Sequence, residues 1–161
     1  MAVREGTAAD AEAVAAFLAR HESAVVARHG ELVDATEHPA LVVEDEGALV
    51  GVLTYVVAGP DCEVLTLHAD PPRSGVGTEL VEAAAVLAGA RGCDRLWLIT
   101  TNDNVEALRF YQRRGFRLTG IHPGAVAQTR RALKPQIPEV AGNGIPIRDE
   151  LDLERPLAQR S

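Results

Sequence analysis

A strand, a glycine-containing turn and a helix follow one another between residues 62 and 91. The run CEVLTLHA is apolar and rich in β-branched side chains, as a buried strand is, and ELVEAAAVLAGA has helical composition and spacing. The turn between them, DPPRSGVG, places Gly75 and Gly77 where the helix begins. A helix in this position connects a strand to a parallel neighbour, and the apolar run DRLWLITT supplies that neighbour. The segment therefore predicts an α/β fold.

The remaining patterns extend this unit to a sheet of about seven strands. Thr7 can cap a first helix, and the sequence DEG at 45–47 joins two β-branched runs as a hairpin. The expected strands are 2–6, 40–44, 48–58, 62–69, 94–101, 116–122 and 145–154. The expected helices are 7–20, 24–30, 76–91, 104–114 and 124–133. The fold class is thus α/β, a single domain over residues 1–161 with a central mixed sheet and helices on both faces, and its fourth and fifth strands are parallel.

Composition and charge narrow the classes of function. Of the 161 residues, 47% are hydrophobic and 24% are charged, and no apolar run approaches the roughly 20 residues that span a bilayer. The N-terminal MAVREGTAAD lacks the apolar core of a signal peptide, so we expect a cytoplasmic protein with no membrane partner. The net charge of −7 argues against a nucleic-acid partner. It suits a cationic substrate, although an acidic balance also serves solubility alone.

The cysteines and histidines predict no metal site. Cys62 and Cys93 form no CxxC motif and are expected as free, buried thiols. The five histidines show no HExxH or comparable ligand spacing. His68, near the end of the fourth expected strand, is expected to be a packed histidine and not a catalyst.

The glycine turn matches neither of the two well-known phosphate loops. A Walker A loop requires a lysine directly after its last glycine, and none follows Gly77. The dinucleotide fingerprint requires a third glycine where this chain has Leu80. The helix start nevertheless offers backbone N–H groups and the positive end of the helix dipole, and Arg73 adds a charge. On its own, the turn fits an anion site and a simple connection equally well.

A second motif favours a binding site. Asn104 and Tyr111 lie seven residues apart on one expected helix, which places them on the same face about 10 Å apart. This helix begins after the fifth expected strand, and the glycine turn begins after the fourth. Because the two strands are parallel, both helix starts lie at their carboxyl ends, where α/β sheets bind ligands.

Together, RSGVGTEL at 73–80 and NVEALRFYQRRGF at 104–116 resemble the motifs of the GNAT superfamily of N-acetyltransferases, and the resemblance extends over most of the chain. It implies acetyl-CoA as co-substrate, with direct acetyl transfer to a primary amine and no acyl-enzyme. It also implies that the fourth and fifth strands splay apart around the pantetheine arm. A non-catalytic acyl-CoA-binding sensor or regulatory domain is the alternative.

The resemblance also assigns roles to individual residues. Tyr111 would protonate the departing thiolate, Asn104 would hydrogen-bond the pantetheine, and the backbone of Leu67 and Ala69 would pair with it. The pyrophosphate would lie on the amides of Arg73, Ser74, Gly75, Val76, Gly77 and Thr78. Pro72 departs from the family motif, which has Gln or Arg three residues before the first glycine, and proline has no N–H to donate.

Acetyl transfer also needs a base, because an amine with a pKa of about 10 is protonated at neutral pH. Glu63 is the first candidate, directly or through a water, and Asp61 on the same strand face is the reserve. Arg109, Arg113 and Arg114 could reach CoA phosphates, but an ordinary solvated helix face is the simpler interpretation.

Asp149 is the third acidic candidate. In the expected strand 145–154, a register that buries the leucines also turns Asp149 inward, among four apolar side chains. A buried carboxylate needs a partner, which is either a cationic acceptor or an arginine such as Arg130 or Arg131. The acceptor, a small molecule or a peptide amine, is not identified by the sequence, and the last strands would allow a homodimer.

Overall fold

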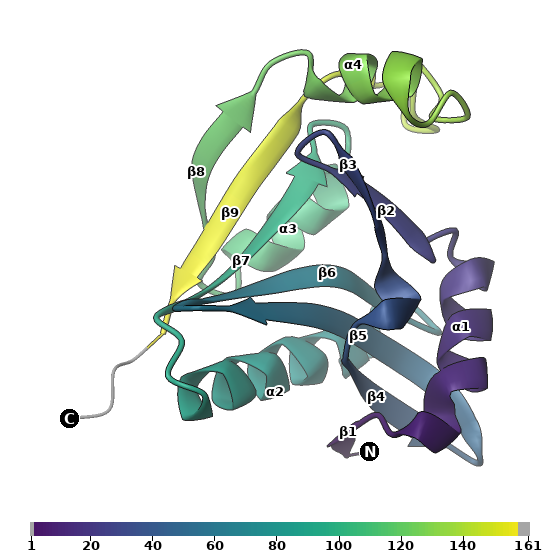
Figure 1. Ribbon diagram of the computed structural model, residues 1–161, viewed down its shortest axis with the longest axis vertical. Helices are drawn as coiled ribbons and strands as arrows, with labels where there is room; N and C mark the ends of the chain where they lie inside the picture. Colours follow the sequence, from purple (N-terminus) through teal and green to yellow (C-terminus); the bar gives the residue numbers. More distant parts are fainter. Residues whose placement is uncertain (1, 158–161) are drawn as a thin grey trace. The chain divides into compact units, whose positions relative to one another are not determined.

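The computed structural model describes residues 2–157, and Figure 1 shows the elements that they form. In chain order these are β1 (Val3–Glu5), η1 (Ala8–Asp10), α1 (Ala11–Arg20), β2 (Val25–Arg28), β3 (Glu31–Asp34), η2 (Ala35–Glu37), β4 (Ala40–Asp45), β5 (Ala48–Ala58), β6 (Asp61–Ala69), α2 (Val76–Ala90), β7 (Arg95–Thr101), α3 (Val105–Gln112), β8 (Arg117–His122), α4 (Ala125–Ala132) and β9 (Glu150–Pro156). Within residues 2–157, no helix has both the length and the apolar character needed to cross a membrane.

Seven strands form one mixed sheet in the order β1-β4-β5-β6-β7-β9-β8, and β2 and β3 form a separate two-stranded sheet. β6 and β7 are the parallel neighbours that α2 connects, so the parallel pair predicted around the glycine turn is confirmed. The chain divides into two compact units. The first draws its described residues from Met1–Val26, Asp34–Leu96 and Pro156–Ser161, and the second comprises Ala27–Val33 and Trp97–Arg155.

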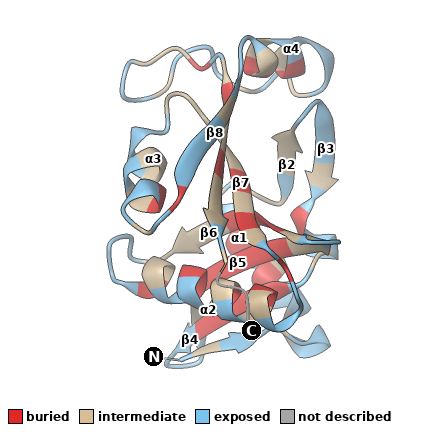
Figure 2. Cartoon of the chain, turned by 90° about the vertical axis from the view of Figure 1, so that its left-hand side faces the viewer, coloured by how far each residue is buried: buried red, intermediate tan, exposed pale blue. Residues whose placement is uncertain are grey.

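In the first unit, helices cover both faces of the strands. Val42 of β4 and Val52 of β5 are fully buried in one cluster with Phe17 of α1. Gly51 faces the other way, because a Cβ placed on it would overlap Val76 at the start of α2. Successive residues of a strand point to opposite faces, so α1 and α2 pack on opposite sides. The burial pattern in Figure 2 follows this arrangement along β5 and along one side of α2.

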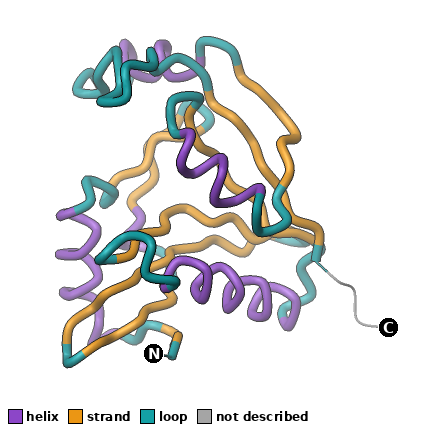
Figure 3. The backbone as a smooth tube through the Cα atoms, turned by 180° about the vertical axis from the view of Figure 1, so that it is seen from behind, coloured by secondary structure: helices purple, strands orange, loops and turns teal. Residues whose placement is uncertain are grey.

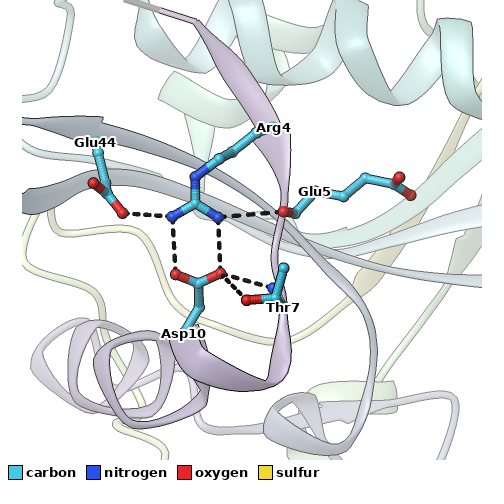
Figure 4. A network of polar contacts seen from close by, with 5 residues as sticks. All are labelled: Arg4, Glu5, Thr7, Asp10 and Glu44. Carbon is cyan, nitrogen blue, oxygen red and sulfur yellow. Dashed lines mark hydrogen bonds and ion pairs between the residues drawn. The ribbon is translucent and has the colours of Figure 1, made fainter.

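The start of α1 is held by a charged network that also ties β1 to β4 (Figure 4). Arg4 donates to both carboxylate oxygens of Asp10, at 2.8 and 2.9 Å, and pairs with Glu44 of β4. Asp10 also accepts the backbone N–H of Thr7 at 2.7 Å. The Arg4 guanidinium and the Thr7 N–H hold the pKa of the Asp10 carboxyl well below its usual range. The capping position predicted at Thr7 is confirmed, and it opens the short turn η1 directly before α1.

The prediction of a second helix at 24–30 is wrong, because this segment is one arm of a hairpin. β2 pairs with β3, and their turn consists of His29 and Gly30, with φ angles of 47° and 77°. Two successive residues with positive φ twist a turn in the sense that antiparallel strands require. The β-branched residues Val25 and Val26 favour an extended chain before this turn. Together these two signals outweigh the helix propensity of the nearby alanines.

The predicted strand at 145–154 is also too long. The segment between α4 and β9 contains no regular helix or strand (Figure 3), apart from an isolated bridge between Val140 and Pro146. Arg130 of α4 holds this segment by donating to three backbone carbonyl oxygens at 2.8 to 2.9 Å. Those carbonyls belong to Ile137, Pro138 and Ile147. The chain therefore becomes a regular strand only at Glu150.

Candidate active site

The turn between β6 and α2 presents the N-terminus of a 15-residue helix to solvent. Gly75 is the capping residue, with a φ of 87°, and the preceding residues from Arg73 on are exposed. The first hydrogen bond of the helix runs from the Glu79 N–H to the Gly75 oxygen, so the helix itself offers no acceptor to the N–H groups of Val76 and Gly77. A Cβ on Gly75 would meet nothing within 4 Å, so space is open beside the capping residue. This end of a helix suits an anion.

The two acidic candidates of β6 differ in their surroundings. Glu63 is buried, with 5% of its surface exposed, although it lies near the start of the strand. Asp61 is paired with Arg95, whose Nε lies 2.8 Å from the Asp61 Oδ1. Further along β6, Leu67 and Ala69 pair with β5 on one side of the strand.

The cysteines are free and buried, as predicted. Burial raises the pKa of the Cys62 thiol to about 12 and also raises the pKa of Cys93. Both thiols are therefore protonated at neutral pH, and neither is an activated nucleophile.

His68 is a packed histidine, as expected. Its ring stacks on the His21 ring with centroids 4.5 Å apart, and its Nε2 lies 2.7 Å from the Ser23 Oγ. His21 in turn contacts Asp70, at 3.0 Å. Burial, reinforced by the neighbouring His21, lowers the pKa of His68 to about 4. His68 is therefore neutral at physiological pH.

This lowered pKa predicts a loss of stability in acid. The pKa of His68 is about 4 when folded and 6.5 for an ordinary histidine, so the unfolded chain takes up the proton first as the pH falls. The free energy of unfolding should decrease between about pH 6.5 and about pH 4, by on the order of 1–3 kcal/mol from this group. Urea denaturation across that range should show a weaker pH dependence for His68→Gln than for the unmodified chain. The same substitution at His38 is the matched control, and equal pH dependence in both variants would contradict the prediction.

In the second unit, Asn104 caps α3. Its Oδ1 accepts the backbone N–H of Ala107 at 3.2 Å. The helix ends before Gly115, which has a φ of 89°, and the Phe116 N–H bonds back to the Tyr111 oxygen at 3.1 Å. The helix predicted over 104–114 is therefore present, with Asn104 at its N-cap and a left-handed residue after its end. Because the Asn104 oxygen caps the helix, its side-chain N–H groups are the part suited to bind a ligand.

Tyr111 is the buried residue of α3, and 8% of its surface is exposed. Its ring contacts Phe110 and Phe116 edge to face, with centroids 5.1 and 5.2 Å away. Burial raises the pKa of the Tyr111 phenol well above its usual value. The ring of Tyr111 is therefore packed in the core, and its phenol keeps its proton at neutral pH.

The three arginines that neighbour Tyr111 in the sequence fit the simpler interpretation, which is an ordinary helix surface. Arg114 lies over the Phe110 ring at 3.7 Å and donates to the Phe110 oxygen at 2.8 Å. Arg109 and Arg113 are exposed. Arg114 therefore packs on its own helix.

Asp149 has a different partner from the one expected. It precedes β9, and its Oδ1 accepts the backbone N–H of Gly124, the capping residue of α4, at 2.8 Å. Asn102 holds its backbone through two hydrogen bonds of 3.0 Å. The predicted pairing with Arg130 or Arg131 is therefore wrong, and the buried carboxylate of this region is Glu150, which is 3% exposed. Asp149 holds the start of α4 in place.

Sequence reasoning missed a cluster in the second unit. His29, His122 and Asp152 meet beside a cavity of about 690 Å³. The cavity is lined by both histidines and Glu150, and by apolar residues that include Ile121, Ala125 and Leu133. The hydrogen bond that His122 donates to the Asp152 carboxylate raises the pKa of His122. The cluster joins residues up to 123 positions apart, so no local spacing could reveal it.

Comparison with known proteins finds a family, related sequences and solved structures that this chain resembles. The sequence model described as the acetyltransferase (GNAT) family matches residues 8–116. The uncharacterized protein YdhI of Bacillus subtilis strain 168 is 47% identical over 109 residues, which cover 68% of each chain. YxbD from the same strain is 43% identical over 116 residues, or 72% of each chain. A Bacillus subtilis acetyltransferase solved in complex with CoA has a similar fold, with a TM-score of 0.70 and 19% identity over 98% of this chain and 99% of that one.

The region that matches the family model contains β6, the glycine turn, α2, β7 and α3, which are the elements that carry both motifs. The match covers more than half of the chain, and a relative with 47% identity supports it. On these grounds, the chain belongs to the acetyltransferase (GNAT) family.

Proposed function

We propose that this chain, acting as one domain over residues 1–161, transfers an acetyl group from acetyl-CoA directly to a primary amine. The amine gives a proton to a base, and its nitrogen then bonds to the thioester carbonyl carbon. The carbon–sulfur bond breaks, the CoA thiolate leaves with a proton from the enzyme, and the nitrogen gives up its second proton, which restores the protonated acid of the enzyme. The acceptor is a small molecule or a peptide amine.

The burial of Tyr111 is the observation that carries this proposal. Burial raises the pKa of the phenol, so Tyr111 keeps its proton throughout the neutral range and is always available as a donor. A protonated phenol whose ring is held by Phe110 and Phe116 can give its proton to the departing sulfur. We assign Tyr111 the role of general acid.

The donor is proposed to bind along the two motifs. Backbone amides from Arg73 to Thr78 would hold the pyrophosphate at the exposed start of α2, where Gly75 leaves open space. Pro72 contributes no N–H to this cradle. The pantetheine would run between β6 and β7, which would splay apart at this point. It would pair with the backbone of Leu67 and Ala69. The Asn104 side-chain amide would donate to it.

Glu63 is proposed as the general base, acting directly or through a water. It is buried in β6, and Asp61, which lies two residues away and is paired with Arg95, is the reserve.

Release of free CoA from acetyl-CoA in the presence of a panel of amines tests the proposed reaction. An amine that accelerates release and appears as its acetyl amide supports it. Tight CoA binding without release for any amine would instead favour the non-catalytic sensor, an alternative that the proline at position 72 also favours.

The donor site can be tested separately by Gly77→Val. A branched side chain in the first turn of α2 should keep an anion away from the amides, so CoA affinity should fall at least tenfold, an effect of about 1.4 kcal/mol. Calorimetry with CoA measures the change, and circular dichroism verifies that the variant is folded. The matched control is Gly89→Val, at the other end of the same helix, where an added Cβ meets nothing within 4 Å. Unchanged CoA affinity in a folded Gly77→Val protein would remove the phosphate role of the turn.

A further inference from the structure

Three side chains in the second unit have the composition of a transition-metal site. His29 lies in the β2–β3 turn, His122 ends β8, and Asp152 lies in β9. Their ligand atoms all lie within 4.8 Å of one another. The His29 Nε2 is 3.2 Å from one carboxylate oxygen of Asp152, and the His122 Nε2 is 2.9 Å from the other. Two imidazole nitrogens thus contact the two oxygens of one carboxylate.

The spacing fits a metal ion. Zinc binds nitrogen and oxygen ligands at about 2.0–2.2 Å, which puts neighbouring ligand atoms of a tetrahedral site about 3.3 Å apart. Both nitrogen–oxygen distances in the cluster are already close to this value. The two imidazoles meet edge to face, with centroids 4.9 Å apart, and their ligand nitrogens lie within 4.8 Å of each other.

The surrounding residues hold the cluster in place. Gly120 lies opposite Asp152 in the β8–β9 pair, and a Cβ there would lie 3.1 Å from the Asp152 Oδ2. The absent side chain therefore leaves room for the carboxylate. The His29 ring stacks on Trp97 at 5.8 Å, and its backbone N–H donates to the buried Glu150 at 3.2 Å. Supporting contacts of this kind orient metal ligands in proteins.

His29 occupies a left-handed turn position with a φ of 47°, a conformation in which asparagine, aspartate and histidine are enriched among residues other than glycine. The turn places its imidazole beside the other two side chains of the cluster.

We propose that His29, His122 and Asp152 form a binding site for a divalent transition-metal cation of the zinc, cobalt or nickel class. Imidazole ligands favour these ions over magnesium and calcium, which prefer oxygen. Three protein ligands leave a coordination position open at the wall of the cavity that both histidines line. The ion would also fasten the β2–β3 hairpin to β8 and β9.

Titration of the metal-stripped full chain with zinc tests the site. Calorimetry should find one zinc ion per chain and no comparable binding of magnesium. Because loss of a supporting residue already costs about 10–100-fold in metal affinity, loss of a ligand should cost at least about 100-fold. His29→Asn and Asp152→Asn should show this loss. Asparagine suits the left-handed turn at position 29, so the hairpin should still fold.

His38→Asn is the matched control, because it removes a histidine that lies outside the cluster. It should leave zinc affinity unchanged. A second readout is thermal: zinc should raise the Tm of the unmodified chain and of His38→Asn, but not that of His29→Asn. Absence of stoichiometric zinc binding, or equal zinc affinity in His29→Asn and the unmodified chain, would overturn the proposal.

Discussion

Tyr111→Phe is expected to lower kcat by about 10²–10⁴-fold, which is the usual contribution of a general acid. The substitution keeps the ring and its contacts with Phe110 and Phe116 and removes only the hydroxyl. Without that proton donor, the CoA thiolate must leave as an anion from a desolvated site. CoA affinity should hardly change, so the loss should appear in kcat. Steady-state kinetics with an amine that the panel identifies, together with calorimetry for CoA, measure both.

The chain supplies a matched control for this experiment. Tyr55 of β5 is the other tyrosine, it is buried with 2% of its surface exposed, and its pKa is likewise raised by burial. Tyr55→Phe should therefore have a similar effect on stability and none on kcat. A decrease of less than about threefold for Tyr111→Phe would leave Tyr111 as a core aromatic residue, since general acid catalysis contributes far more.

Glu63→Gln should lower kcat/KM near neutral pH by about 10²–10⁴-fold, because the protonated amine then has no base to take its proton. The shape of the side chain is nearly unchanged, so CoA binding should persist. The deficit should shrink as the pH rises toward the pKa of the amine, about 10, because solvent then deprotonates the acceptor without the enzyme. A pH profile of kcat/KM for both proteins reveals this recovery.

Asp61→Asn distinguishes the two acidic residues of β6. If Glu63 is the base, this variant loses its ion pair with Arg95 and some stability, but it retains most of its activity. A larger loss of activity for Asp61→Asn than for Glu63→Gln would transfer the role to Asp61. A Glu63→Gln deficit that is constant at every pH would make Glu63 structural.

Several elements followed from local sequence patterns. α2 begins at Val76, where the glycine turn predicts it, and α3 is capped by Asn104 and ended at Gly115. The parallel pair β6 and β7 followed from the helix between them. In each case, the residues that decide the structure lie within a few positions of one another, so their spacing can be read without knowing the rest of the fold.

The misassigned segments depended on distant partners. Residues 25–34 form a hairpin whose turn is anchored to Glu150, far along the chain. Asp149 is held by Gly124 and Asn102, and Arg130 holds the loop that delays the start of β9. Alternation in the sequence predicts which side chains share a face. It does not predict which distant backbone groups those side chains will hydrogen-bond.

For the candidate site, the sequence by itself determined the two motifs, and with them the family and the proposed roles of Tyr111 and the glycine turn. Tertiary structure decided that Glu63 is buried, that Asp61 is paired, and that His29 and His122 meet at Asp152. The physical reason is the range of the interactions. Helix caps and turns arise between near neighbours, whereas burial and side-chain clusters depend on which strands pair, and the side-chain contacts that result join residues as many as 123 positions apart.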